Sequence, residues 1–292
     1  MARVRLLNLL LFGAVFLAVF PIRSGWAWGE EGHRWINQVA AAHVPADMPS
    51  FFRDAGPRLA FLGPEPDRWR DVRELYSALR EVNNPDHFID IDKPQNFEAL
   101  PDDRYKYSDW LRAAGKNPKE VGYLPYSILE GYQKLQVLFR LWRERESERA
   151  QIEQNIVYYA GVLGHYVADG SQPLHTTVHY NGWSTSSNPD LNTREPLHGR
   201  FETEYVRAQI RPEDFEPLAR QAEKLQDPFA DIVKYLFESQ THVSKLYELD
   251  KTARWDDRNR NPDSKRFVAA RLAAGSQMLA NLWYTAWTNS TR

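Results

Sequence analysis

The most constraining feature of this sequence is an almost uniformly apolar stretch from Ile152 to Ala168. Its length and helical periodicity predict one long helix, which Asp169, Gly170 and Pro173 bring to an end. A helix that is apolar on nearly all of its faces has to be covered by neighbouring elements on every side. We therefore expect this helix to lie at the centre of the fold.

Helical periodicity also dominates the rest of the chain, whereas the alternating pattern of strands is scarce. One apolar stripe joins Trp35, Val39 and Ala42, and a long helix is predicted from Leu124 to Trp142, before a charged break. Further helices are predicted over four segments: residues 200–208, 217–225, 228–249 and 263–288. Ser, Asn, Pro and Thr are common between Ser171 and Pro196, which predicts a long loop of a kind that is often functional.

The chain is long enough for a large hydrophobic core, and no Ser/Gly-rich linker divides it. No internal repeat or low-complexity tract stands out. The predicted fold class is therefore all-α, with a single compact multi-helix domain.

The N-terminus has the pattern of a secretory signal peptide. Arg3 and Arg5 make it positively charged, an apolar stretch follows from Leu6 to Phe20, and Gly25 and Ala27 supply the small residues that signal peptidase requires. The apolar stretch is shorter than the ~20 residues that span a bilayer, and no second one follows, which favours export over a membrane anchor.

We therefore predict a signal peptide over residues 1–27 and a functional domain over residues 28–292, with no stable membrane anchor once the leader is removed. The protein is expected to be secreted or periplasmic. Cleavage after Ala27 would make Trp28 the mature N-terminus. Its free α-amino group and backbone carbonyl, together with His33 five residues later, can chelate a metal ion.

Charge and composition exclude several kinds of chemistry. The formal net charge of −2 gives no broad basic surface, so a nucleic acid or phospholipid would have to be bound by metal ions and a few cations. The chain contains no cysteine, which excludes disulfides, thiolate nucleophiles and thiolate metal ligands. Metal binding is left to histidines, carboxylates and the N-terminus.

The histidines are unevenly distributed, and one group is dense: His165, His175, His179 and His198. His165 and Asp169 are four residues apart at the end of the apolar helix, which places both side chains on one face. His198 and Glu202 repeat this spacing. An isolated pair of this kind is more often a surface ion pair or a cap. Two pairs, one of them on an apolar helix, favour a metal ion, which would compensate the cost of burying them.

Two upstream residues extend this pattern. Taken alone, Asp67 could cap a helix and His87 could be a core histidine with its hydrogen bonds satisfied. Taken with the downstream histidines and acids, they could complete a metal site. Nitrogen and oxygen ligands without thiolates suit zinc in open, catalytic sites, where water takes a free position.

These residues resemble a known family, the trinuclear zinc phosphodiesterases, which comprises the single-strand-specific nucleases of plants and fungi and the zinc-dependent bacterial phospholipases C. The run from His165 to His175, HYVADGSQPLH, looks like the family's HxxxDxxQPLH signature without a gap. The mature N-terminus, with Trp28, Gly29, Gly32 and His33, is a second and independent match. The resemblance spans nearly the whole mature chain and implies the helical fold of that family.

The resemblance implies three zinc ions per chain. The first would be held by four side chains: Asp67, His87, His165 and Asp169. A second, more exposed ion would be held by three: His175, His198 and Glu202. The third would take the amino nitrogen and carbonyl oxygen of Trp28 together with His33, and would share Asp169 with the first.

A mechanism also follows from the resemblance. Two zinc ions about 3.5–4 Å apart can clamp a bridging hydroxide, which would attack phosphorus in line. The remaining ion would stabilise phosphate oxygens and the leaving oxygen. As in the nuclease branch, Asp90 would orient or deprotonate the water and Arg70 would contact the phosphoryl oxygens. An alternative of equal weight is an Arg70–Asp90 salt bridge that only braces the site.

The two branches of the family differ in substrate, and this sequence shares features with each. The short spacing from Trp28 to His33 and the position of Asp90 are similar to the nucleases. Glu202 as the last ligand and the absence of cysteine are more similar to the phospholipases.

The segment after the signature motif carries the candidate substrate contacts. Asn181 could hydrogen-bond a base edge, and Trp183 or Tyr180 could stack on the base, a contact worth ~1–3 kcal/mol. His179 could touch the substrate or support the metal site. The same aromatic side chains could equally lie against acyl chains or glycerol.

We therefore expect an exported zinc-dependent hydrolase of P–O ester bonds, with nuclease or 3′-nucleotidase activity on single-stranded nucleic acid as the leading hypothesis. The alternative within the family is a phospholipase C that acts on phospholipids. A hypothesis from another class is a secreted zinc-binding protein without catalytic activity. Open ligand sets argue against it, because structural zinc sites are normally closed by four protein ligands. The oligomeric state is left open.

Overall fold

The computed structural model describes residues 28–71, 76–93, 99–183, 191, 193 and 195–291. The predicted signal peptide, residues 1–27, lies outside the described residues. Within them the regular structure is helical, and β-pairing is limited to two isolated bridges, Ile89 with Gly122 and Trp183 with Thr193. This confirms the prediction of an all-α fold. In the described part of the chain, no helix combines the length and the apolarity needed to cross a bilayer.

Short helices come first along the chain: α1 (Gly29–Ala42), α2 (Ser50–Arg53), α3 (Gly56–Leu62), α4 (Glu65–Asp71), α5 (Ser77–Asn83), the 3₁₀-helix η1 (Asn84–His87), α6 (Arg104–Ala113) and α7 (Pro118–Val121). Two long helices follow, joined by a 3₁₀ turn: α8 (Leu124–Glu144), η3 (Glu146–Glu148) and α9 (Arg149–Ser171). The described chain ends with short helical turns and further α-helices: η4 (Pro173–Thr176), η6 (Arg200–Tyr205), α10 (Val206–Gln209), η7 (Pro212–Asp214), η8 (Glu216–Leu218), α11 (Pro228–Thr241), α12 (Val243–Thr252) and α13 (Pro262–Asn289).

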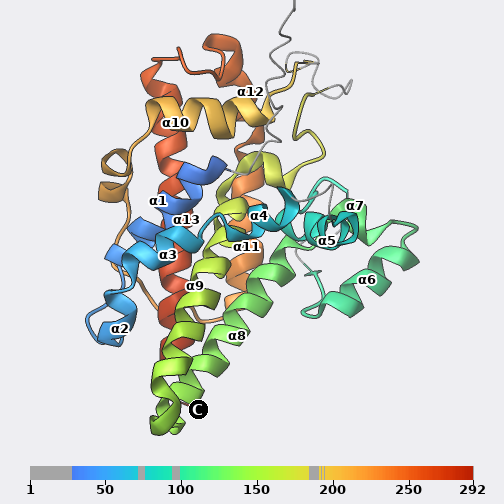
Figure 1. The fold of residues 1–292 in the computed structure, drawn as a ribbon. Helices are drawn as coiled ribbons and strands as arrows, with labels where there is room; N and C mark the ends of the chain where they lie inside the picture. The colour runs from blue at the N-terminus through green and yellow to red at the C-terminus, as the bar shows by residue number, and fades with distance from the viewer. Residues whose placement is uncertain are drawn as a thin grey trace, which may run out of the picture.

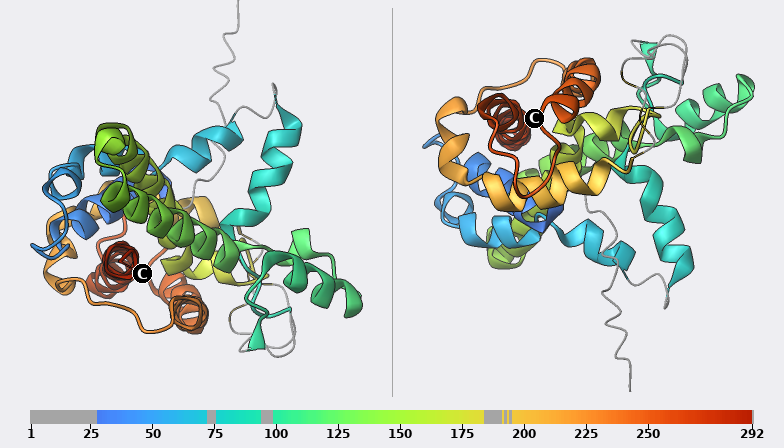
Figure 2. Two further views of the ribbon diagram at one scale, coloured as in Figure 1. Left: turned by 90° about the horizontal axis from the view of Figure 1, so that it is seen from below. Right: turned by 90° about the horizontal axis from the view of Figure 1, so that it is seen from above.

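The long helices form a bundle. Because η3 is so short, α8 and α9 have to run antiparallel, and Figure 1 shows them side by side with α11 and α13 alongside. Helices α1 and α3 pack on a further side of α9. Figure 2, seen along the bundle, shows α5 and α6 projecting away from it on one side. Helix α9 is therefore surrounded by α1, α3, α8 and α13.

The C-terminal half of α9 is the centre of the core. Every residue from Ala160 to Ser171 is buried, which confirms the prediction of a central helix for this half. Nearer the N-terminus of the helix, Tyr158 and Tyr159 reach solvent. The two turns that carry His165 and Asp169 are thus fully buried.

The predictions of long helices from Leu124 to Trp142 and over residues 263–288 are confirmed by α8 and α13, but the helix predicted over residues 217–225 is wrong. After η8 this segment runs along α13 without helical structure. Three of its backbone N–H groups donate to side chains of α13: Arg220 to Gln277 Oε1 (2.7 Å), Glu223 to Asn281 Oδ1 (2.9 Å) and Leu225 to Thr285 Oγ1 (2.9 Å). These acceptors recur every four residues and so share one face of α13. They replace the hydrogen bonds that a helix would have made.

Two further predictions are corrected in detail. The helix predicted over residues 228–249 is divided at His242, whose N–H donates to Ser239 O at 3.2 Å in a turn tighter than an α-helix. The helix predicted over residues 200–208 is present, but its first part, η6, is a π-helix. Such turns are frequent at functional sites, and η6 carries Glu202.

The close approach of α3 to α9 generates a testable prediction. A Cβ at Gly161 of α9 would lie 2.4 Å from Leu62 Cβ of α3, so one of the two helices would have to move. Gly161→Ala is therefore expected to lower the free energy of unfolding by about 1–3 kcal/mol, the usual cost of overpacking a core. Urea denaturation of both forms measures the difference.

Gly56→Ala provides the matched control, because a Cβ there meets nothing closer than Ala41 Cβ at 3.9 Å. Equal stability of the two variants would contradict the packing of α3 on α9.

Candidate metal centre

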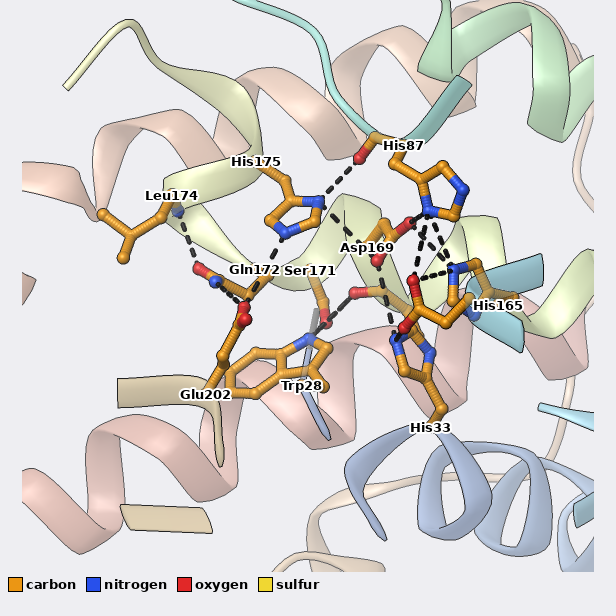
Figure 3. A network of polar contacts seen from close by, with 12 residues as sticks. Trp28, His33, His87, His165, Asp169, Ser171, Gln172, Leu174, His175 and Glu202 are labelled. Atoms are coloured by element: carbon orange, nitrogen blue, oxygen red, sulfur yellow. Dashed lines mark hydrogen bonds and ion pairs between the residues drawn. The ribbon is translucent and has the colours of Figure 1, made fainter. Parts of the chain in front are cut away.

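The buried end of α9 is a meeting point for side chains that commonly bind metals. His165 and Asp169 belong to α9, and the others come from α1, α4, η1, η4, the turn that leads into η6, and η6 itself. Figure 3 shows most of these side chains pointing toward one another around Asp169. The full set is His33, Asp67, His87, His165, Asp169, His175, His198 and Glu202. All of them except His198 are buried.

Their ligand atoms fall into three groups, within each of which the atoms lie no more than 4.8 Å apart. The first group is Asp67, His87 and His165. The second is His33, His165 and Asp169. The third is His175, His198 and Glu202. The structure thus brings together every side chain that the sequence assigned to zinc.

Asp169 connects the three groups. Its Oδ2 lies 3.0 Å from His87 Nδ1 and 3.3 Å from His165 Nε2. Its Oδ1 lies 3.6 Å from His33 Nε2 and 3.6 Å from His175 Nδ1. A second carboxylate, that of Asp67, also faces His165, with Oδ1 3.8 Å from His165 Nε2. One buried carboxylate therefore faces four imidazole rings.

The third group is more exposed to solvent, and its ligand atoms lie closer to one another. His198 Nε2 lies 2.6 Å from Glu202 Oε2, and His175 Nε2 lies 3.1 Å from His198 Nε2. The i,i+4 spacing of His198 and Glu202 places both on one face of the turn that begins η6. Gln172 donates its Nε2 to Glu202 Oε2 (3.1 Å) and so fixes the carboxylate.

Backbone carbonyls fix the protonation of two of these histidines. His165 Nδ1 lies 2.9 Å from Gly63 O, and His175 Nδ1 lies 2.6 Å from His87 O. Because a carbonyl oxygen can only accept, each Nδ1 carries the hydrogen, and each Nε2 presents a lone pair to the centre. This is the arrangement that metal-binding histidines adopt.

The electrostatics of the centre show the cost of assembling it without a cation. Burial raises the pKa of Asp67 to about 6 and that of Asp169 to about 7. Burial lowers the pKa of His165 to about 4 and holds that of His87 well below its usual value. Each shift favours the uncharged form of a group that has lost water. A cation would offset these penalties, because it stabilises the carboxylates and needs neutral imidazoles.

Glu202 differs from the other two buried carboxylates. Burial acts to raise its pKa, but the adjacent His198 and His175 outweigh burial and lower the pKa below its usual value. The third group therefore keeps its carboxylate ionised and available as a ligand.

The donor set fits zinc. It consists of imidazole nitrogens and carboxylate oxygens, with no thiolate and three side-chain ligands in each group, as in open catalytic zinc sites. Among the described residues, Asp169 Oδ1, Glu202 Oε1 and His87 Nε2 are buried without a hydrogen-bond partner. Buried polar atoms are normally satisfied, and a bound ion would satisfy those on the carboxylates.

Trp28 is anchored beside the centre by its side chain. Its indole N–H donates to Ala168 O (2.8 Å) and Ser171 Oγ (2.9 Å), on either side of Asp169 in α9. The residue is buried and has a left-handed backbone with a φ of 46°. These contacts hold the start of the described chain against the centre. Ligation by its α-amino group stays a prediction.

Arg70 and Asp90 have different ion-pair partners. Arg70 Nη2 lies 2.9 Å from Asp67 Oδ1, and Asp90 Oδ2 lies 2.8 Å from Lys93 Nζ. Burial raises the pKa of Asp90, and the hydrogen bond from Lys93 opposes that rise. Lys93 was not predicted as a partner of Asp90, although its i,i+3 spacing could have indicated this role. In the part of the chain that the structure describes, the proposed Arg70–Asp90 bridge is replaced by these two pairs.

The four candidate substrate contacts lie in one turn, His179 to Trp183. The rings of His179 and Trp183 are stacked on each other, with centroids 4.2 Å apart. The side-chain oxygen of Asn181 accepts from the backbone N–H groups of Leu197 and His198. Tyr180 is exposed by 54% and lies with its ring 5.9 Å from that of His198. Tyr180 is thus the one of the four with a ring both open to solvent and next to the third group.

Comparison with known proteins gives matches among solved structures only. No family model and no curated protein matches the chain. It is similar to an alpha-toxin from Clostridium absonum (TM-score 0.41, 16% identity) and to the alpha-toxin of an avian strain of Clostridium perfringens (TM-score 0.45, 17% identity). Each match covers 92% of this chain and 66% of the toxin, so the chain spans about two thirds of the toxins' length. The assignment of the centre rests on the chain's own residues.

Removal of one ligand is expected to remove one zinc ion. His175→Ala takes one of three side chains from the third group, and two remaining ligands bind zinc weakly. The zinc content after dialysis, measured by mass spectrometry, should fall by about one ion per chain relative to the parent protein. His43→Ala is the control, because His43 Nδ1 contacts Val39 O and lies outside the three groups. Unchanged zinc content in His175→Ala would contradict the assignment of this group.

Zinc affinity is also expected to rise with pH up to about pH 7, because zinc has to displace protons from Asp67 (pKa about 6) and Asp169 (pKa about 7) at lower pH. His165, with a pKa of about 4, is already neutral over most of this range and does not oppose the trend. Calorimetric titrations in buffers of different ionisation enthalpy count the protons released. More protons per zinc are expected at about pH 5.5 than at about pH 8, and equal numbers would contradict the raised carboxyl pKa values.

Proposed function

We propose that this chain is a zinc-dependent phosphodiesterase that acts on single-stranded nucleic acid or 3′-nucleotides. The observation that carries the proposal is the position of Asp169, a buried carboxylate shared by imidazole rings from all three ligand groups. Ligand groups joined in this way suit two or more ions held close together, an arrangement common in enzymes that cleave phosphate esters.

The ions would be held by the three groups defined above, with Asp169 common to the buried ones. Bound zinc would supply Lewis-acid activation of water and neutralisation of phosphate charge. The protein's part is to fix the ligands before substrate arrives, which it does through buried side chains and the backbone acceptors Gly63 O and His87 O.

Arg70 is suited to bind the phosphate. One of its guanidinium nitrogens lies 2.9 Å from Asp67 Oδ1, and its side chain is partly exposed. A guanidinium has five N–H donors, so the others can reach phosphoryl oxygens while Asp67 holds the group in place. This role is a proposal beside the bracing role that the same contact supports.

Asp90 is suited to hold or accept the proton of the attacking water. Its carboxylate is buried, and burial increases its proton affinity. Lys93 Nζ contacts Asp90 Oδ2 and also donates to Glu120 O, so the lysine connects the carboxylate to the backbone of α7. The contact with Lys93 would therefore hold the Asp90 carboxylate in a fixed orientation.

Tyr180 favours a nucleic acid as the substrate. Its exposed ring next to His198 offers a flat apolar surface beside the most open ligand group. Such rings bind bases by stacking, without regard to sequence. A single-stranded substrate is required, because a base within a duplex has its faces covered by its neighbours.

Phospholipid is the second candidate substrate, and a specific surface favours it. Tyr76, Leu79 and Val82 are exposed on and next to α5. This helix is linked to the centre because Arg80 donates to Arg70 O. An apolar surface beside basic residues at the edge of an active centre could contact a lipid interface.

Export is part of the same proposal. We infer that residues 1–27 are removed and that the protein is secreted or periplasmic. Zinc would then bind to a mature chain that begins at Trp28. The anchoring of the Trp28 indole to α9 supports a defined N-terminus beside the centre.

The experiment that tests the proposal uses the chain from residue 28, loaded with zinc. Release of nucleotides from a single-stranded oligonucleotide and of phosphocholine from phosphatidylcholine vesicles are measured in parallel, with His175→Ala as the blank. Nucleotide release that the blank abolishes is the expected result. Phosphocholine release alone would transfer the assignment to phospholipid, and full zinc content without either activity would favour a non-catalytic zinc-binding protein.

Tyr180→Ala is expected to raise KM for the oligonucleotide by roughly 5- to 150-fold, because stacking on an aromatic ring contributes ~1–3 kcal/mol per base. Its effect on kcat should be smaller, since the ring is not a ligand. Tyr105→Ala removes an even more exposed tyrosine, on α6, and serves as the control. If both variants keep the KM of the parent protein, the stacking role of Tyr180 is contradicted.

A further inference from the structure

His198 is the least supported ligand of the centre. It is the only partly exposed member of the three groups. His165 and His175 each donate Nδ1–H to a backbone carbonyl, which holds the ring. Among the described residues, no such acceptor is found for His198 Nδ1, and its polar contacts run through Nε2 to His175 and Glu202. The position of its ring therefore depends on how its backbone is held.

Asn181 holds that backbone. Its Oδ1 accepts two hydrogen bonds, from Leu197 N at 2.8 Å and from His198 N at 3.2 Å. These N–H groups open the helical run that carries His198 and Glu202, where no earlier turn supplies a carbonyl acceptor. A side chain from a distant part of the sequence thus satisfies the first donors of this run, one of which belongs to the ligand itself.

The turn that carries Asn181 is itself fixed to α12. Tyr247 donates its hydroxyl to His179 O and accepts from Gly182 N at 3.0 Å, so one hydroxyl holds the turn on both sides of Asn181. Trp183 stacks on His179 and meets the Tyr247 ring edge-on, with centroids 5.3 Å apart. The chain of contacts therefore runs from Tyr247 through the turn to Asn181 and on to His198.

We propose that Asn181 is a positioning residue for His198 and sets the zinc affinity of the group His175, His198 and Glu202. Its carbonyl oxygen is committed to this task, which leaves only its amide nitrogen for any contact with substrate. The inference rests on the proposed function only in that this group binds zinc.

The test compares zinc affinity in three variants, by competition with a chromophoric chelator and without substrate. Asn181→Ala is expected to weaken the most weakly held zinc ion by about 10- to 100-fold, the usual effect of removing a group that orients a ligand. Asn181→Asp keeps an oxygen acceptor in the same place and is expected to restore most of the affinity. Tyr247→Phe, which loosens the turn without touching Asn181, is expected to weaken the same ion to a smaller extent.

Asn261→Ala is the matched control. Asn261 also accepts a backbone N–H at the start of a helix, α13, through Asp263 N at 2.8 Å, but it has no link to the centre. The Asn261→Ala variant should be less stable than the parent protein but bind zinc with the same affinity. If Asn181→Ala binds zinc like the parent protein and instead raises KM, the positioning role is overturned and Asn181 contacts substrate.

The outcomes separate this inference from the proposed function. Parent affinity in Asn181→Ala overturns the positioning role and leaves the metal centre intact. Absence of zinc binding by the parent protein overturns both.

Discussion

The buried carboxylate of Asp169 is the constraint on which the rest of this structure depends. It sits near the end of a central helix, and its oxygens lie between 3.0 and 3.6 Å from nitrogens of four histidines. Burial raises its pKa to about 7, so the bare chain would hold it partly protonated at neutral pH. A cation changes this balance, because it favours the ionised carboxylate and the neutral imidazoles together. The fold around α9 is therefore best understood as a scaffold for bound metal.

Local sequence patterns were sufficient to predict the helices whose structure depends mainly on their own residues. The apolar stretch of α9 and the periodicity of α8 and α13 predicted these helices closely, and the spacing of His165 and Asp169 placed both on one face. The segment 217–225 failed because its structure depends on acceptors that α13 supplies from more than fifty residues away. The π-helical turn of η6 likewise has no simple signature in composition. Tertiary contacts override propensity in such places.

The candidate centre shows the same division. Side chains with metal chemistry can be recognised in the sequence, and the structure brings eight of them together. Backbone groups that orient them cannot be recognised, because any residue has a carbonyl: Gly63 O and His87 O belong to this class. Lys93 and Asn181 were not identified as supporting residues, since their roles depend on partners that only the fold places beside them. The candidate ligands could thus be chosen from the sequence, whereas the groups that orient them could not.

The most direct test of this account is to locate the metal ions in the chain that begins at Trp28. Crystals grown with zinc and measured at the zinc absorption edge would show each ion as a peak in an anomalous difference map. The account predicts peaks within the three ligand groups, with the buried ones adjacent to Asp169. Absence of any peak beside Asp169, with zinc found only at histidines outside the three groups such as His43, would contradict it.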